Sequence, residues 1–173
     1  MRFKLSITIL CTMLFMSGCY LPMNGRVLDA ETNRPIDGAV VLVEWTKTIG
    51  FGLTYTESYK VVEALSDKDG KFELPGCYSP FVNVPDVTVY KKGHVAWNNK
   101  YVFPTHANRT DFTWKSGYVI MLKKFNKEYS YTQHQSFIDI AASLSSANAK
   151  KRLFMKAYED GEEEEVLRER NMK

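Results

Sequence analysis

Residues 25–43, GRVLDAETNRPIDGAVVLV, and residues 64–72, ALSDKDGKF, decide the fold of this 173-residue chain. In both stretches, apolar residues in alternation flank a short run of Asp, Asn, Pro or Gly. Such turn residues tolerate the backbone angles of a chain reversal, and alternation places every second side chain on one face of a sheet. Each stretch therefore predicts a β-hairpin, with strands at 25–29, 39–45 and 71–74.

Further strands are expected at 54–65, 87–90 and 117–124, with a loop at 75–85 and a glycine-bearing connection at 47–53 that exposes apolar residues. Short strands separated by turn signals are typical of an antiparallel sandwich, here of about seven strands. In the strand at 39–45, alternation divides the side chains between two faces. One face would carry Ala39, Val41, Val43 and Trp45, and the other Val40, Leu42 and Glu44.

These motifs resemble the carboxypeptidase regulatory-like family, whose domains are transthyretin-like (prealbumin-like) antiparallel β-sandwiches. The matching patterns are G-x-V-x-D from Gly25, P-I-x-G-A-x-V from Pro35, S-D-x-D-G-x-F from Ser66, and K-x-G-H ending at His94. The resemblance covers residues 24–124. It implies the fold rather than an activity, because the motifs are structural and the family's catalytic peptidase part is absent here.

The N-terminus predicts a bacterial lipoprotein. Arg2 and Lys4 precede an uncharged apolar run at 5–15, which is too short for a comfortable membrane span. The motif MSGC that ends at Cys19 resembles a lipobox, which implies cleavage before Cys19 and a lipid anchor on it. Tyr20, rather than Asp, then implies delivery to the outer membrane, on its periplasmic or surface face. An ordinary signal peptide or an uncleaved anchor is the alternative.

The expected organisation has four parts: a signal peptide at 1–18, a lipidated linker at 19–23, the sandwich at 24–124 with an insertion at 94–114, and a helical C-terminal extension at 125–173. Processing would remove Cys11 and modify Cys19, so that Cys77 has no intramolecular disulfide partner. Cys77 could be a reactive thiol or an intermolecular link, but a small buried hydrophobe is the favoured interpretation.

The insertion at 94–114 is rich in aromatic residues and side-chain amides. Trp97, Tyr101 and Trp114 could stack against a sugar, which would make the insertion a glycan-binding site. Alternatively, Trp97 and Phe103 could form a satellite core under the loop. The second interpretation is favoured, because aromatic side chains bury large areas and are commonly used in this way.

From Tyr131 onward the apolar residues recur at helical spacing. Thr132 is a candidate N-cap, and Gly161 is expected to interrupt the helical pattern. The stripe is narrow, which favours docking on the protein's own sheet over an interaction arm for a partner. It comprises Phe137, Ile140, Ala141, Leu144, Leu153, Phe154, Ala157 and Tyr158.

Motifs for enzymatic chemistry are missing from the sequence. His94, His106 and His134 have neither zinc-peptidase spacing, and no G-x-S-x-G elbow or phosphate-binding glycine loop occurs. Asp67-x-Asp69-Gly70 is better explained as a turn than as a calcium loop. A net charge of +3 is too small to indicate a nucleic-acid partner.

The sequence thus predicts a non-enzymatic cell-envelope module without cofactor or metal, anchored through Cys19, that binds or scaffolds a protein partner. A carbohydrate-binding module is the alternative. A small-molecule hydrolase ranks last, because no catalytic set is visible.

Overall fold

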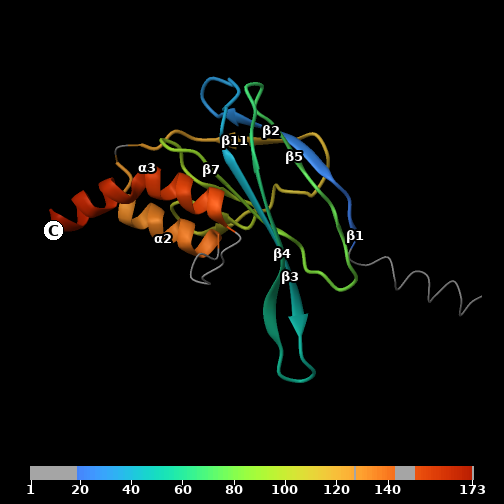
Figure 1. The fold of residues 1–173 in the computed structure, drawn as a ribbon. Coiled ribbons are helices and arrows are strands. Elements are labelled where there is room, and N and C mark those ends of the chain that lie inside the picture. Colours follow the sequence, from blue (N-terminus) through green and yellow to red (C-terminus); the bar gives the residue numbers. More distant parts are fainter. Residues whose placement is uncertain (1–18, 127, 143–150, 173) are drawn as a thin grey trace, which may run out of the picture.

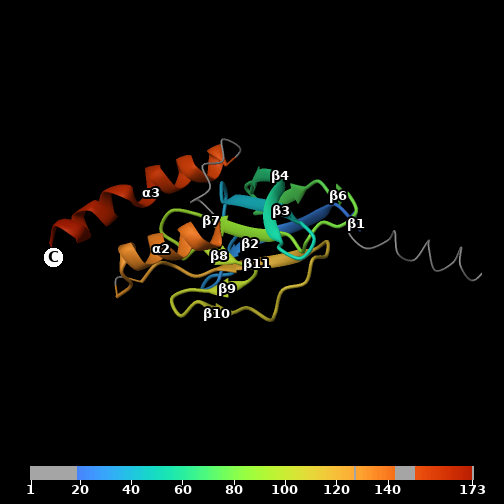
Figure 2. The ribbon, with the colours of Figure 1, turned by 90° about the horizontal axis from the view of Figure 1, so that it is seen from below.

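The computed structural model describes residues 19–126, 128–142 and 151–172, so the expected signal peptide at 1–18 lies outside the described residues. The protein is mainly β, with two sheets packed face to face and two helices on the outer face of one sheet (Figures 1 and 2). The three-stranded sheet has the order β11 (Tyr118–Leu122), β2 (Met23–Asp29), β5 (Lys71–Leu74). The four-stranded sheet has the order β4 (Tyr55–Leu65), β3 (Val40–Ile49), β7 (Asp86–Tyr90), β8 (Trp97–Asn98).

Four short strands form two further pairs: β1 (Cys19–Tyr20) with β6 (Cys77–Tyr78), and β9 (Tyr101–Val102) with β10 (Ala107–Asn108). The helices are α2 (Tyr131–Ala141) and α3 (Arg152–Asn171). The two main sheets together contain seven of the described strands, which agrees with the predicted sandwich.

Strand β3 lies at the centre and is buried on both faces, and its side chains divide between the faces as its alternation predicts. Val41, Val43 and Trp45 enter the core between the two sheets, together with Ile120 and Phe72. The opposite face of β3 carries Val40 and Leu42, which pack against the helices. The sheet that contains β3 is therefore the middle of three layers, because apolar residues occupy both faces of this strand.

The two stretches that decide the fold are not simple hairpins, contrary to the prediction. β2 and β5 belong to one sheet and β3 and β4 to the other, so each turn carries the chain between sheets. Ser66 ties the two crossings together: its Oγ accepts from Ala39 N at 2.8 Å and donates to Ile36 O at 2.7 Å. Alternation and turn residues are the same in a hairpin and in such a crossing, so the sequence does not distinguish them.

One strand pair departs from the antiparallel pattern, because β11 runs parallel to β2. Parallel neighbours need a long connection, and most of the chain separates these two strands. The predicted insertion at 94–114 is part of that connection and contains β8, β9 and β10, of which β8 extends the four-stranded sheet. The predicted loop at 75–85 likewise contains β6.

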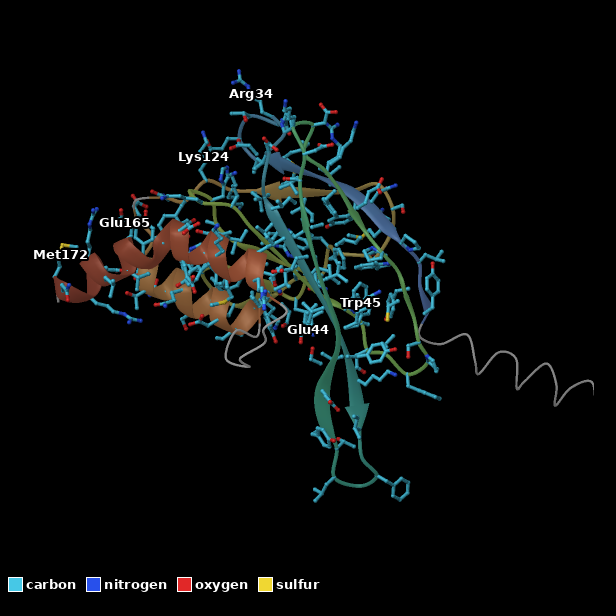
Figure 3. All side chains as sticks on the ribbon, in the orientation of Figure 1. Arg34, Glu44, Trp45, Lys124, Glu165 and Met172 are labelled. Carbon is cyan, nitrogen blue, oxygen red and sulfur yellow. The ribbon has the colours of Figure 1, made fainter. Side chains whose placement is uncertain are left out.

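The predicted connection at 47–53 is shorter than expected. β3 continues to Ile49 and β4 begins at Tyr55, after a register shift between Trp45 and Thr46. Residues 46–58, called the projecting hairpin below, extend beyond the sandwich as a two-stranded ribbon (Figures 1 and 3). The expected exposure of its apolar residues is confirmed at Phe51 and Leu53.

The C-terminal helices dock on the protein's own sheet, as favoured by the sequence. Phe137 and Ile138 of α2 and Phe154 and Tyr158 of α3 pack in one cluster with Tyr90 of β7. Two details are corrected. The N-cap of α2 is Ser130, whose side chain accepts from Gln133 N, rather than Thr132, and Gly161 lies inside α3 rather than ending a helix.

The predicted stripe also needs correction, because Ile140 and Leu153 are exposed while Ile138 is buried. Leu144 lies outside the described residues.

The turn after β2 is held by hydrogen bonds to the Asp29 carboxylate. Asp29 Oδ1 accepts from Thr32 N at 2.8 Å, from Glu31 N at 3.0 Å and from Thr32 Oγ1 at 2.9 Å. Its Oδ2 lies 3.3 Å from His94 Nε2. The Thr32 backbone N–H is the main cause that lowers the pKa of Asp29 well below its ordinary value.

Because the folded-state pKa is lowered, the stabilisation from Asp29 is complete above the unfolded pKa of about 4 and is lost as the pH falls below it. Asp29→Asn is expected to reduce stability at neutral pH and to flatten the acid-induced loss of stability. Urea midpoints of both proteins across the acidic range measure this. Equal acid-induced losses in the two proteins would contradict the assignment to Asp29.

Candidate functional site: an open strand edge beside a slot

The outer edge of β11 is available for further pairing. Leu122 O accepts from Ala30 N at 2.9 Å on the β2 side, whereas Lys123 O accepts from Val95 N at 2.8 Å on the opposite side. Backbone groups alternate in direction along a strand, so the N–H and C=O groups of Val119 and Met121 also face away from β2. Among the described strands, β11 pairs only with β2.

A slot opens next to this edge, because the chain after Val95 diverges from β11. Its volume is about 330 Å³. One wall is β11, with Val119 and Met121. The other wall is the segment from Val95 to Trp97, with Arg109 above it. The slot thus combines apolar side chains with unpaired backbone donors and acceptors, which together suit an extended peptide.

Arg109 fixes the rim of the slot. Its Nε donates to Asn98 O at 2.6 Å, and its Nη1 donates to Asp111 Oδ1 at 3.2 Å. Its guanidinium carbon lies 4.7 Å from the centre of the Trp97 ring. A guanidinium held by a backbone oxygen and an aromatic face loses little further freedom when a ligand binds. The rim is therefore pre-organised, while Asp111 remains largely exposed.

The three candidate glycan-binding residues do not lie together. Trp97 lines the slot but is only 6% exposed, and Phe112 and Arg109 pack against its ring. Tyr101 packs against the helix-side core. Trp114 packs on Trp45, with ring centres 5.7 Å apart. Trp97 and Phe103 are both buried, but they do not form one satellite core under the loop: Trp97 lies in the core between the two sheets and Phe103 in the helix-side core.

Sequence reasoning missed Arg109, Asp111 and the β11 edge. A charged pair at spacing two within an aromatic insertion could have indicated the first two. No sequence signal identifies an open edge, because edge status depends on which strands pair.

The three histidines considered as candidate zinc ligands make contacts within the fold. His94 contacts Asp29, His106 packs 5.4 Å from Phe137, and His134 is enclosed. Within the described ranges, no group of three metal-binding side chains occurs. The Asp67–Gly70 segment is a turn, as predicted, because Gly70 N donates to Asp67 O at 2.8 Å.

Cys77 is buried in the core, as favoured by the sequence. Cys19 lies in β1 opposite Tyr78, and its proposed lipid is not tested by the fold. None of the helices in the described residues is long and apolar enough to cross a membrane.

The fold defines a three-layer protein: a β-sandwich covered on one face by a helical pair. No protein-family model and no curated protein matches the chain, so the resemblance to the carboxypeptidase regulatory-like family stays a prediction from motifs.

Among solved structures, the chain is similar to a double mutant of shaft pilin SpaA from Lactobacillus rhamnosus GG, at 17% identity and a TM-score of 0.37 over 61% of this chain. The chain spans about half, 48%, of that pilin's length. It is also similar to the pilin's C-terminal domain, at 18% identity and a TM-score of 0.35, over 63% of this chain and 100% of that domain.

Proposed function

We propose that this protein is a non-enzymatic binding module of the cell envelope, anchored by a lipid on Cys19 at the outer membrane, that takes up an extended segment of a partner protein. The open edge of β11 beside the slot carries this proposal. An added strand would bond to the backbone of Val119 and Met121, and one of its side chains would enter the slot. The helical extension covers the protein's own sheet, so the proposal places the partner at the strand edge rather than on the helices.

A non-enzymatic role is supported by the position of the one enclosed histidine–carboxylate pair. His134 Nε2 accepts from Ala96 N at 2.9 Å, so Nδ1 carries the proton that is donated to Glu162 Oε2 at 2.8 Å. Both side chains are buried, and each joins a helix to a neighbouring segment. This pair holds the helical layer in place and does not face a substrate.

Proline at position 119 tests the edge. The N–H of Val119 faces outward, so Val119→Pro removes a donor for an added strand without removing a bond to β2. A photo-cross-linking residue at position 123 is expected to capture one partner protein in cells, through an extended segment of that partner. We expect Val119→Pro to abolish this cross-link. Val119→Thr, which keeps the N–H, should retain the cross-link.

Undiminished cross-linking of the proline variant would refute strand addition on β11. Circular dichroism and thermal melting establish whether Val119→Pro is folded. If it is not, Met121→Lys provides the same test, because a lysine on an edge disfavours added strands.

A carbohydrate-binding function is the second candidate, favoured by the polar rim of the slot. Asp111 is exposed at the rim beside Arg109. In this case Asp111→Ala should reduce retention on envelope glycans, while Val119→Pro should not, because sugars do not require the strand's N–H.

A further inference from the structure

Three uncharged segments of the surface meet on one side of the molecule. No charged residue occurs between Cys19 and Gly25, between Lys47 and Glu57, or between Glu73 and Asp86, although a quarter of the chain is charged. Each segment exposes large apolar side chains. We call these side chains together the apolar face. They are Leu21, Ile49, Phe51, Leu53, Tyr55, Tyr78, Phe81 and Val84.

Contacts between the three segments make the face continuous. Cys19 lies opposite Tyr78 in the β1–β6 pair. Lys47, at the base of the projecting hairpin, bridges to Val82, and Asn83 N donates to Thr46 O at 2.8 Å. In Figure 1, β1 lies at the right, the projecting hairpin points downward, and the helices lie at the left; Figure 2 also shows β1 and β6 at the end of the molecule away from the helices.

The tip of the projecting hairpin presents apolar side chains to its surroundings. Phe51 and Leu53 are almost fully exposed, and Phe81 in the neighbouring loop is 75% exposed. Gly50 has φ +113°, and a Cβ there would lie 2.2 Å from Leu53 O, so the tight turn requires glycine. Single exposed apolar residues are common on soluble proteins, but a continuous group of this size indicates a binding surface.

The distribution of charge favours a lipid bilayer as the occupant. Lys47 and Glu57 stand opposite each other in the ribbon and are the first charged residues below the tip. The ribbon beyond them reaches about 10 Å, at roughly 3.4 Å per residue, which matches the depth of interfacial insertion. Tyr55 and Tyr78 have the amphipathic character of residues at a membrane–water interface. The three segments contain no charged residue, and Lys60 Nζ, which donates to Gly76 O at 2.8 Å, reaches the third segment from β4.

We propose that the apolar face rests on a lipid bilayer, with Phe51 and Leu53 inserted to the boundary between headgroups and acyl chains. The backbone of a two-stranded ribbon has unpaired groups along its edges, so insertion stops where water still reaches them. The inference rests on the proposed function only for the anchor at Cys19. It adds an orientation: the β1 side of the sandwich lies on the membrane, and the helical layer points away.

Spin labels on the full lipidated chain test this orientation. Phe51→Cys and, as the matched control, Leu167→Cys on α3 are labelled with a nitroxide; Cys77 is buried and so protected from the reagent. The proteins are reconstituted on vesicles of phosphatidylethanolamine and phosphatidylglycerol. At position 51 we expect the collision rate with a water-soluble nickel chelate to fall about threefold relative to position 167, because lipid excludes the chelate.

Equal chelate access at both positions on floated vesicles would refute membrane contact of the apolar face, while the lipid anchor would still stand. Protection of position 51 only after addition of an envelope protein fraction would also overturn it, in favour of a protein occupant. The mass of the N-terminal peptide reports lipid on Cys19 separately. If that lipid is absent, the anchor fails, and protection of position 51 is measured with the unanchored chain at high vesicle concentration, where full chelate access would refute the face as well.

Discussion

Replacing Glu44 by alanine is expected to lower the free energy of unfolding by about 3–5 kcal/mol, which is the range for removing one partner of a buried ion pair. Glu44 lies on β3, on the side of the helices, with Trp45 on the opposite side (Figure 3). Its Oε2 accepts from Lys151 Nζ at 2.7 Å, and the same ammonium donates to Ala142 O at 2.8 Å. Lys151 is 1% exposed. Without Glu44, the ammonium charge of Lys151 would remain inside the protein without this carboxylate.

A double variant distinguishes the loss of the ion pair from the loss of side-chain packing. The double variant Glu44→Leu with Lys151→Met places apolar side chains of similar volume in the same space, and such replacements are often neutral or stabilising. Urea unfolding of the full chain should therefore show a large loss for Glu44→Ala and a small change for the double variant. A loss below about 1 kcal/mol for Glu44→Ala would mean that the pair behaves as an exposed one.

Alternation in the sequence predicts which face of a strand is buried, but not what covers it. The faces of β3 are as expected, because period two leaves one arrangement for Val41, Val43 and Trp45. The same pattern also puts Glu44 on the face with Val40 and Leu42. Lys151 is 107 positions away in the chain. Nothing local in the sequence joins these two charges, so the pair could not be predicted.

Strand pairing is the other part that sequence alone leaves open. Turn residues at 67–70 indicate a reversal, but β5 pairs with β2 and not with β4. For the same reason, the candidate site could not be predicted from the sequence. The N–H groups of Val119 and Met121 are open only because β11 is an edge strand, and long-range pairing determines that. In contrast, the aromatic content of the insertion correctly indicated burial of Trp97 and Phe103, although the two side chains enter two different cores rather than one local cluster.

Gly161 was predicted to end a helix, but in the structure it allows a close contact between a helix and a strand. Glycine often ends a helix, and this was the prediction here. Instead, α3 continues through Gly161, and a Cβ at that position would lie 2.3 Å from the Tyr90 hydroxyl. The glycine therefore provides space for Tyr90, whose hydroxyl donates to Glu162 Oε1 at 3.2 Å. Burial, and then the Glu162 carboxylate, raise the pKa of Tyr90, so the phenol stays protonated and keeps this donor.

Gly161→Ala sets two effects against each other. Alanine in the interior of a helix is favoured over glycine by about 1 kcal/mol. The added methyl group, however, collides with a fully buried tyrosine, and overpacking of this kind typically costs about 1–3 kcal/mol. Tyr90 cannot simply move, because Phe154 and Tyr158 pack against its ring at 6.0 and 6.1 Å between ring centres. Displacement would also break its hydrogen bond to Glu162. We therefore expect a net loss of stability.

The same substitution in a Tyr90→Phe background isolates the cause. Removing the hydroxyl takes away the closest atom, and the next one, Tyr90 Cζ, would lie 3.2 Å from the new methyl group. A shift of a few tenths of an ångström relieves that contact, so the helix preference for alanine should offset most of the remaining strain. Thermal unfolding of the four proteins in this cycle gives the coupling. If Gly161→Ala is equally destabilising in both backgrounds, the hydroxyl is not the obstacle; if it is stabilising in both, the close approach of α3 to β7 is wrong.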